Sequence, residues 1–397
     1  MSLSRRGFIT RLAPGRDAHA AALVAARGRE ALVAGSLYRE AGELVPPAAN
    51  EIRISSNENP LGPGQHALDA MTGKFPQAGR YPFNSTPNEG ALVAAVAKKF
   101  GVKNENVVMG AGSGEILTNA VRAFTSASRP LVTAWPSFEN PHTTAEKIGT
   151  PIREIPLDAQ LRIDIPKMLA AVKGAGLVFF CNPNNPTATV HSATAVADFV
   201  KAVRQGSPDT VILLDEAYHD YVTDPSYKSG IELAMSTPNV FVARTFSKAY
   251  GMAGIRMGYA VGQAAVIKEL GRYKMPYNVS VPGIAGGIAA LENQAHIDRE
   301  RARNTEVRTF TLRAFQDMGY KATDSQANFI FVDLKRPAKG FRDACAQQGV
   351  LVGRDFPPYE KTHCRVSIGT MDEMKQAVAV FKNVLGASQT TSQRQEV

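Results

Sequence analysis

The sequence predicts an α/β protein built around a mostly parallel sheet, with a smaller α+β unit toward the C-terminus. Three short apolar runs, at 177–181, 211–214 and 240–244, have the length and composition of buried parallel strands. A segment with helical spacing, 193–203, lies between the first two, which gives a strand–helix–strand unit. Polar residues follow each run, and α/β sheets bind their ligands at the carboxyl ends of such strands.

Length and composition narrow the classes of protein. The chain has 397 residues, of which 44% are hydrophobic and 20% charged, enough for two domains or for one large body with a satellite. No apolar stretch reaches the roughly 18 residues that a transmembrane helix needs, so we expect no membrane span. The net charge of +9 is scattered and includes no basic block interleaved with aromatics. This argues against nucleic acid as a partner and suits small anionic ligands.

The cysteines are Cys181, Cys345 and Cys364, an odd number without a CxxC pair. Such a set suits neither a disulfide scaffold nor a zinc site, and we expect no metal. Cys181 lies within an apolar run, where the usual interpretation is a small buried hydrophobe.

The N-terminal stretch Ser4-Arg5-Arg6-Gly7-Phe8-Ile9 looks like a twin-arginine export signal. Such a signal continues into an apolar stretch, but here Arg11, Arg16 and Asp17 interrupt it. We therefore interpret residues 1–45 as either a basic N-terminal arm or a twin-arginine-like signal. The protein would be cytoplasmic in the first case and periplasmic in the second.

Two polar loops follow this segment. The first spans residues 56–63 after a short strand at 52–55, and the second contains Arg80-Tyr81-Pro82. Loops punctuated by proline and glycine commonly carry binding residues.

A Gly-rich turn at 110–115 follows the strand-like run 107–109 and leads into apolar residues with helical spacing. A strand, a Gly-rich turn and a helix start surround an anion with free backbone N–H groups and the helix dipole. The alternative, a dinucleotide-binding turn, needs its third glycine at another position and an acid about twenty residues further on. Arg129 and Pro130 stand there instead. A phosphate cradle fits better.

Polar and aromatic groups also follow the later strands. Phe138 comes after the run 131–133, where an aromatic ring can stack on a ligand, although core packing is the more common use. The loop 182–187 (NPNNPT) offers amide donors. Asp215 ends the next strand, with Tyr218 just beyond it.

Lys248 follows the last of these strands, beside Thr245 and Ser247 and shortly before Arg256. A lysine amine forms Schiff bases with carbonyl compounds, and hydroxyls together with arginine would hold an anion beside it. The complete set matches pyridoxal 5′-phosphate, which needs a lysine, donors for its phosphate and an acid on the pyridine nitrogen so that the ring can accept electrons. A phenol or amide at the ring hydroxyl and an aromatic over the ring complete the requirements.

After Tyr277 the pattern changes to that of a small α+β unit. The expected elements are helices at 283–291 and 298–317, strands at 328–334, 349–355 and 365–369, a helix at 371–385 and a frayed polar tail from Ala387.

The motifs resemble those of the fold-type I, pyridoxal-phosphate-dependent class I/II aminotransferases, and among them the histidinol-phosphate aminotransferase branch. The resemblance covers roughly residues 50–385. It rests on segments in family order and spacing, namely Asn57-Glu58-Asn59-Pro60, Arg80-Tyr81-Pro82, Asn184-Asn185-Pro186-Thr187, Asp215-Glu216-Ala217-Tyr218, and Ser247-Lys248 with Arg256.

The family implies a large domain with a mostly parallel seven-stranded sheet and a smaller α+β domain formed by both chain ends. On that basis we expect an N-terminal part of the small domain at 46–80, a large cofactor-binding domain at 81–285, the rest of the small domain at 286–386 and a polar tail at 387–397.

The resemblance also implies roles for individual residues. Lys248 would bind the cofactor covalently and move the proton during catalysis, Asp215 would pair with the pyridine nitrogen, and Tyr218 and Asn185 would contact the ring hydroxyl. Phe138 would stack on the ring, at a position where many relatives carry tyrosine. The phosphate site would comprise Gly112, Ser113, Gly114, Thr245, Ser247 and Arg256, completed by Tyr81 of a second subunit. A homodimer with shared active sites is therefore expected.

For the substrates, an amino donor and a 2-oxo acid, the resemblance implies Arg365, Arg354 and Asn57. Two arginines suit a phosphate dianion, but one of them could bind a carboxylate while the other meets a side chain. The substrate therefore stays open. The N-terminal arm and the aromatic, proline-rich stretch 353–359 depart from the branch.

Three other classes of protein are alternatives to an aminotransferase. A lyase of the same fold, similar to threonine-phosphate decarboxylase, would use the same cofactor residues. A cofactor-binding regulator would need a DNA-binding module, and the N-terminal extension shows no helix-turn-helix pattern. A nicotinamide oxidoreductase would need the dinucleotide fingerprint that the turn at 110–115 lacks.

Overall fold

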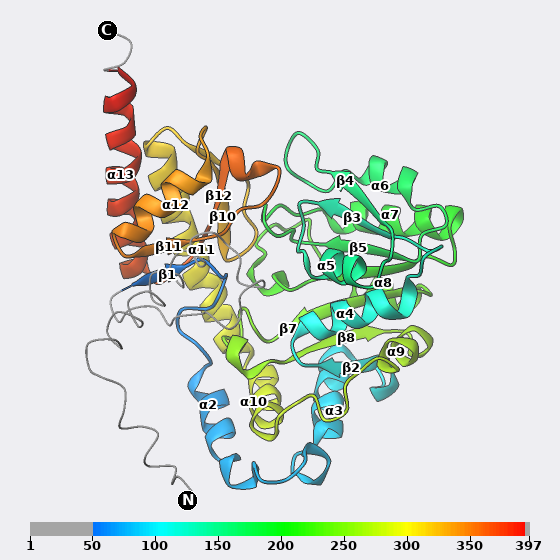
Figure 1. The fold of residues 1–397 in the computed structure, drawn as a ribbon. Coiled ribbons are helices and arrows are strands. Elements are labelled where there is room, and N and C mark those ends of the chain that lie inside the picture. The colour runs from blue at the N-terminus through cyan, green and yellow to red at the C-terminus, as the bar shows by residue number, and fades with distance from the viewer. Residues whose placement is uncertain (1–50, 394–397) are drawn as a thin grey trace, which may run out of the picture.

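The computed structural model describes residues 51–393 (Figure 1). The arm or signal predicted for residues 1–45 lies outside the described residues, as does the end of the predicted tail, 394–397. Among the helices of the described range, none is both long and apolar enough to cross a membrane.

A seven-stranded sheet forms the centre of the larger part of the molecule, in the order β2-β8-β7-β6-β5-β3-β4. Neighbouring strands are parallel except at β8, which runs antiparallel to both β2 and β7. The predicted mostly parallel seven-stranded sheet is therefore confirmed, while β4 and β8 are strands that the apolar runs did not reveal. The strands are β2 (Val107–Gly110), β8 (Gly258–Gly262), β7 (Val240–Thr245), β6 (Val211–Asp215), β5 (Leu177–Cys181), β3 (Leu131–Trp135) and β4 (Ile152–Pro156).

Helices cover both faces of this sheet. Phe179 of β5 packs with Leu117 in one core, whereas its neighbours Val178 and Phe180 pack with Phe199 in the core of the opposite face. Burial on both faces explains why the strands are continuous apolar runs. The first core is bordered by α4 (Ser113–Phe124), α5 (Asn140–Lys147) and α9 (Ala264–Gly271), and the second by α3 (Glu89–Phe100), α6 (Ile165–Ala171), α7 (Ala193–Gly206), α8 (Ile231–Ser236) and α10 (Val281–Glu292).

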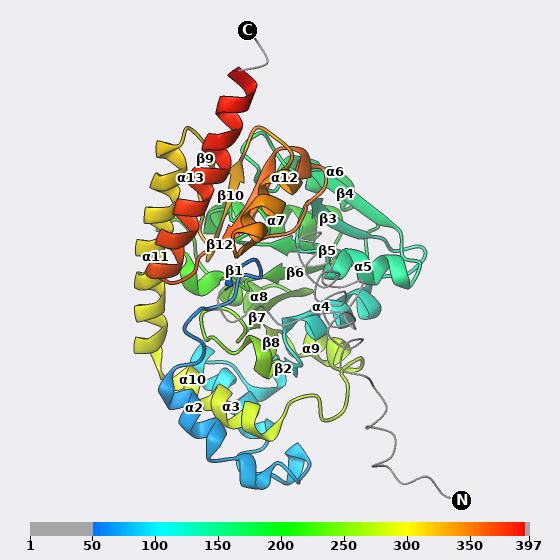
Figure 2. The same ribbon diagram turned by 60° about the vertical axis from the view of Figure 1, so that its left-hand side comes forward.

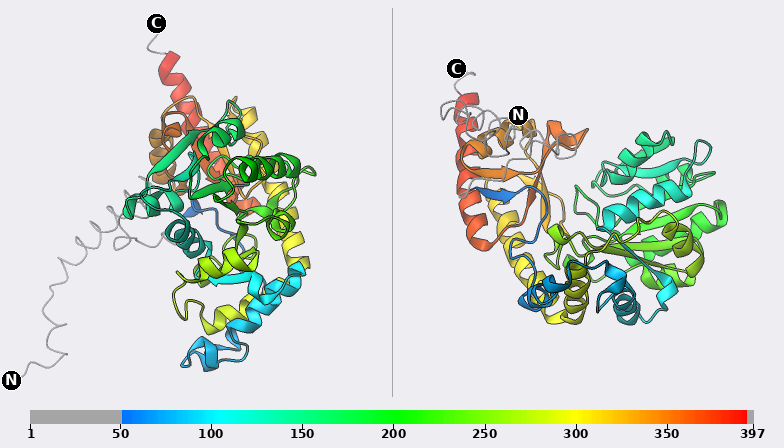
Figure 3. Two further views of the ribbon diagram at one scale, coloured as in Figure 1. Left: turned by 90° about the vertical axis from the view of Figure 1, so that its right-hand side faces the viewer. Right: turned by 60° about the horizontal axis from the view of Figure 1, so that its bottom comes forward.

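The two ends of the described chain meet in a smaller unit. β1 (Ile52–Ile54) pairs in parallel with β11 (Val350–Val352), and Ile54 shares a core with Phe315 and Phe381. The right panel of Figure 3 shows β1, in blue, among the orange and red C-terminal elements. The other elements are β9 (Lys321–Ala322), β10 (Phe329–Asp333) and β12 (His363–Ser367), which form an antiparallel sheet, and α11 (Gln294–Asp317), α12 (Ala338–Gln347) and α13 (Met371–Gln393).

Two helices of this unit are longer than predicted. α11 begins at Gln294 because the Asn293 side chain accepts a hydrogen bond from the backbone N–H of His296 and caps the helix. α13 continues to Gln393, into the segment expected to be a frayed tail. Its earlier turns pack beside α11 (Figure 2), and a helix nucleated by such packing extends readily through polar residues.

The segment between β1 and the sheet also packs on α10. α2 (Gln65–Thr72) crosses it closely, since a Cβ on Gly286 would lie 2.5 Å from Cγ of Met71. This contact connects the N-terminal segment to α10, the helix that precedes α11.

Candidate functional site

A cavity of about 580 Å³ lies where the carboxyl ends of the parallel strands face the smaller unit. The structure brings most of the sequence-predicted residues to its wall, namely Asn57, Ser113, Gly114, Phe138, Asn185, Asp215, Tyr218, Thr245, Ser247, Lys248, Arg256, Arg354 and Arg365. Gly112 immediately precedes this wall, and Tyr81 lies apart from it.

Lys248 is carried by the loop that follows β7. Its Nζ lies 3.3 Å from the carbonyl oxygen of Ser56 and 5.6 Å from the ring centre of Tyr218. Burial, reinforced by the positive charge of Arg365, lowers the pKa of this amine to about 8. A sizeable fraction is therefore neutral near physiological pH, as a nucleophile or a base requires.

Asp215 is the last residue of β6 and is 2% exposed. Its Oδ1 accepts a hydrogen bond from the backbone N–H of Ala217 at 3.2 Å, and its Oδ2 lies 3.8 Å from Sγ of Cys181. In the described part of the chain no lysine or arginine forms an ion pair with it. Burial raises the pKa of this carboxyl to about 7. A cationic group placed next to it would stabilise its ionised form.

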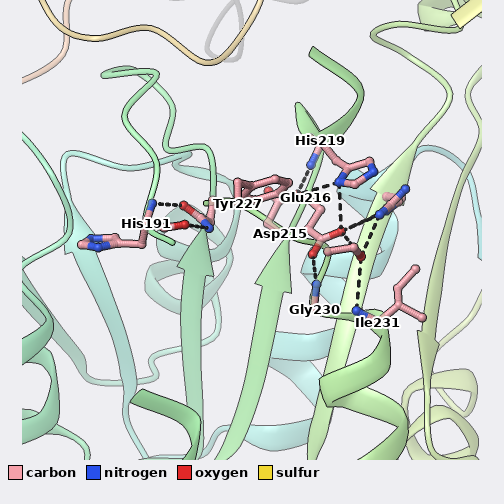
Figure 4. A network of polar contacts seen from close by, with 11 residues as sticks. His191, Asp215, Glu216, His219, Tyr227, Gly230 and Ile231 are labelled. Carbon is pink, nitrogen blue, oxygen red and sulfur yellow. Dashed lines mark hydrogen bonds and ion pairs between the residues drawn. The ribbon is translucent and has the colours of Figure 1, made fainter. Parts of the chain in front are cut away.

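The neighbouring Glu216 points away from the cavity, because successive strand side chains alternate in direction. Its Oε2 accepts hydrogen bonds from Nε and Nη2 of Arg244 at 3.0 and 2.8 Å, and from the hydroxyl of Ser229 at 2.8 Å. Its Oε1 accepts from the backbone N–H of Gly230 (Figure 4). This buried, satisfied network anchors the turn that carries Tyr218.

Tyr218 is held by Asn57, which residues from two further distant segments fix in place. Its hydroxyl lies 3.0 Å from Nδ2 of Asn57, whose Oδ1 in turn accepts from the Ser367 hydroxyl at 2.7 Å. The backbone of Asn57 has φ of 55°, and its carbonyl accepts from Nδ2 of Asn328 at 3.0 Å. Burial raises the pKa of the Tyr218 phenol, which therefore stays protonated and can donate.

Arg365 is 5% exposed and makes hydrogen bonds to uncharged oxygens. Nη1 donates to Oδ1 of Asn185 and Nη2 to the carbonyl of Ser55, each at 2.7 Å. Its Nε is buried and has no hydrogen-bond partner among residues 51–393. Burial and the nearby Arg354 lower the pKa of this guanidinium to about 10, so it remains charged at neutral pH and available to an anion.

The turn before α4 has the geometry of a phosphate cradle. Gly112 has φ of 77°, and a Cβ there would lie 2.4 Å from Nη2 of Arg256. Nη1 of Arg256 lies 3.5 Å from the Ser247 hydroxyl, and the Thr245 hydroxyl accepts from the Ser247 N–H at 3.0 Å. A glycine, a guanidinium and two hydroxyls thus converge on the N-terminus of a helix, which favours anions.

Some residues of the site were not predicted from the sequence. Glu139 lines the cavity and forms an ion pair with Arg354, and Cys181 lies beside Asp215. Ser367 and Asn328 act on the site through Asn57, and Asn328 also donates to the carbonyl of Glu58 at 3.3 Å. Glu139 directly follows Phe138 after a strand end, and this position could have indicated a site residue. Nothing in the local sequence around Cys181, Ser367 and Asn328 indicates a role in the site.

Tyr81 does not line the cavity of this single chain. It is 64% exposed, and its ring packs at 6.0 Å from that of Phe83 and at 5.1 Å from that of Tyr277.

The residues present fit pyridoxal phosphate. A buried amine, a buried carboxyl without a cationic partner and a cradle at Gly112 that a Cβ would fill are the groups that this cofactor requires. Residues 49–381 match the family model described as aminotransferase class I and II. The chain belongs to the class I and II aminotransferase family.

Relatives of this family match 80% or more of the chain. The histidinol-phosphate aminotransferase of Moorella thermoacetica is 35% identical over 84% of this chain and 85% of its own length. The aromatic amino acid aminotransferase of Rhodococcus jostii is 38% identical over 80% and 86%, respectively. The structure of histidinol-phosphate aminotransferase from Sinorhizobium meliloti in complex with pyridoxal 5′-phosphate superposes with a TM-score of 0.79 at 26% identity, covering 89% of this chain and 98% of the other.

This aminotransferase is a pyridoxal-phosphate enzyme that moves an amino group between an amino compound and a 2-oxo acid. The sequence-based predictions of enzyme class and cofactor are confirmed. The alternative of a decarboxylase is less well supported, since both of these relatives, at 35% and 38% identity, are aminotransferases.

Proposed function

We propose that Lys248, Asp215 and Tyr218 are the catalytic residues of this transaminase. The observation that carries the proposal is that a buried amine and a buried carboxyl face one cavity with their pKa values displaced toward neutrality. When bound, pyridoxal phosphate supplies an electron sink that stabilises negative charge at the substrate Cα. Lys248 would bind the cofactor covalently and then carry the proton between Cα and cofactor C4′, a role that suits an amine with a pKa of about 8.

The other groups would orient the cofactor. Asp215 would keep the pyridine nitrogen protonated, and Tyr218 and Asn185 would bind the ring hydroxyl. Phe138 would cover one face of the ring. The phosphate would be held by Gly112, Ser113, Gly114, Thr245, Ser247 and Arg256, which the cradle geometry supports.

The substrates would bind next to the ring. Arg365 would hold the anionic group, and Arg354 and Asn57 would be the other substrate-binding residues of the same cavity. The donor would be an amino acid or an amino-alcohol phosphate, the two classes named in the relatives, and the acceptor a 2-oxo acid.

A homodimer would complete the site. Tyr81 would reach the cofactor phosphate of a second subunit, since in one chain it lies exposed outside the cavity. Other large exposed apolar residues lie near it in sequence or pack beside it, including Phe75, Phe83 and Tyr277. Sedimentation equilibrium of the holoenzyme tests this proposal: a monomer mass at micromolar concentration would contradict it.

The chain would divide into two domains. Residues 46–80 and 286–386 would form the small domain, and residues 81–285 the large one.

The test of the reaction is an absorbance titration of the purified holoenzyme with single amino compounds, without an oxo acid. We expect the band of protein-bound pyridoxal phosphate to give way to that of pyridoxamine phosphate with the true donor. Lys248→Ala should show no turnover and no protein mass increase after borohydride reduction. Full activity in this variant would refute the assignment, and carbon dioxide release without an oxo acid would favour a decarboxylase.

A further inference from the structure

The substrate end of the cavity contains three arginines, and two of them are already neutralised. Arg53 pairs with Glu58 at 3.4 Å, and Nη2 of Arg354 pairs with Oε1 of Glu139. Within the described residues no carboxylate lies at ion-pair distance from Arg365. Of the three arginines, Arg365 is therefore the one without a carboxylate at ion-pair distance in the described range, and the Glu139 charge acts on it only from farther away.

The pair between Arg354 and Glu139 is the better shielded of the two. Its side chains are 19% and 21% exposed, against 37% and 42% for Arg53 and Glu58. Shielding from water strengthens an ion pair and makes its charges less available to a ligand.

The structure also holds Arg354 in place from the side of the smaller unit. Its guanidinium carbon lies 4.3 Å from the ring centre of Phe356, and Nη1 donates to the carbonyl of Asp355 at 3.1 Å. The Asp355 carboxylate is in turn bound by both terminal nitrogens of the buried Arg342. Turning Arg354 toward a ligand would therefore break contacts on two sides.

We propose that Glu139 determines specificity by neutralising Arg354, so that this enzyme selects amino acids with a single carboxylate over amino-alcohol phosphates. The inference rests on the proposed function, in which Arg365 binds the substrate anion. A carboxylate brings one negative charge to the one free guanidinium. A phosphate ester brings nearly two at pH 8, since its second pKa is about 6, and it would meet the Glu139 carboxylate as well.

The experiment measures binding to the pyridoxal-phosphate-loaded enzyme by calorimetry at pH 8, with two unreactive probes that share a phenyl group. 3-Phenylpropionate is the monoanion and phenyl phosphate the dianion. We expect the wild type to favour the monoanion by about tenfold or more, the effect of one nearby charge at the dielectric of a cleft. Glu139→Gln should strengthen phenyl phosphate binding about tenfold and phenylpropionate binding only about threefold, because the removed charge acts on two negative charges in the first probe and on one in the second.

Two control variants isolate the cause. Glu58→Gln removes the same charge from a more exposed pair in the same cavity and should change the ratio less than about threefold, because solvent screens it. Glu139→Gln combined with Arg354→Met should lose the gain in phosphate binding. A gain that persists without Arg354, an unchanged ratio in Glu139→Gln, or a wild type that prefers the dianion would each overturn the proposal.

Transamination by the same samples is followed separately, by the absorbance change with amino donors. An enzyme that binds the probes in the expected ratio but never forms pyridoxamine phosphate would contradict the proposed function and leave the role of Glu139 supported. An active transaminase whose ratio of probe affinities is the same with and without Glu139 would support the proposed function and contradict the role of Glu139.

Discussion

Replacing Asp215 by asparagine should stabilise the cofactor-free protein at neutral pH. The carboxyl is buried and its pKa rises from 3.8 to about 7. Each pKa unit corresponds to about 1.36 kcal/mol, so the full displacement of about three units amounts to about 4 kcal/mol. Asparagine keeps an oxygen that can accept from Ala217 but carries no charge, and so it removes this penalty.

The sign follows from the direction of the shift. Well below pH 3.8 the carboxyl is protonated in both the folded and the unfolded chain, and the penalty is absent. As the pH rises toward 7, the unfolded chain releases the proton while the folded chain retains it, so the free energy of unfolding of the wild type falls. Above 7 the difference no longer grows.

Urea unfolding of the apoprotein checks this expectation. Asp215→Asn should be more stable than the wild type by about 2 kcal/mol at pH 5 and by about 4 kcal/mol at pH 8. With excess pyridoxal phosphate the stability difference between the two proteins should shrink or change sign. The wild type binds the cofactor more tightly and therefore gains more stability from binding it. Equal stability of the two apoproteins at pH 8, or a difference that does not change with pH, would refute the reasoning.

Two further predictions concern the anion sites. Gly112→Ala should lose about 1–3 kcal/mol of stability, because φ of 77° with ψ of 164° is a combination that essentially only glycine adopts. It should also retain cofactor poorly in a dialysis assay, because the methyl group displaces Arg256. Gly101→Ala has φ of 65° with no described neighbour within 4 Å, and so it should lose stability without losing cofactor. Equal cofactor retention in both variants would contradict the cradle. Arg365→Ala should lower kcat/KM about 10- to 100-fold in steady-state assays by the loss of charge-assisted hydrogen bonds, and an unchanged kcat/KM would mean that the substrate anion binds elsewhere.

Much of the fold was predictable because its signals are local. The buried strands β5, β6 and β7 are apolar runs since both faces of the sheet are covered, and the intervening α7 has an apolar stripe with helical spacing. The strand β8 was not predicted because two of its five residues are glycines, which interrupt the apolar run, and because it folds back antiparallel to β7. The extent of α13 escaped too, since polar residues extend a helix only once its apolar turns have docked.

The site divides in the same way. Lys248, Asp215 and the turn at Gly112 were predictable because each follows a recognisable strand, and strand ends converge at one edge of a parallel sheet. The residues that tune them were not. Asn57 reaches Tyr218 across 161 positions of sequence and Ser367 across 310.

The sequence by itself determined the chemistry of this protein: a lysine, an acid, a phenol and a phosphate cradle at successive strand ends, which together specify pyridoxal phosphate. Only the tertiary structure decided how many charges the substrate meets. Glu139 and Arg354 are 215 positions apart, and neither residue type nor spacing indicates that they pair. The physical reason is that secondary structure follows from local periodicity, whereas the compensation of one charged group by another depends on packing between distant segments.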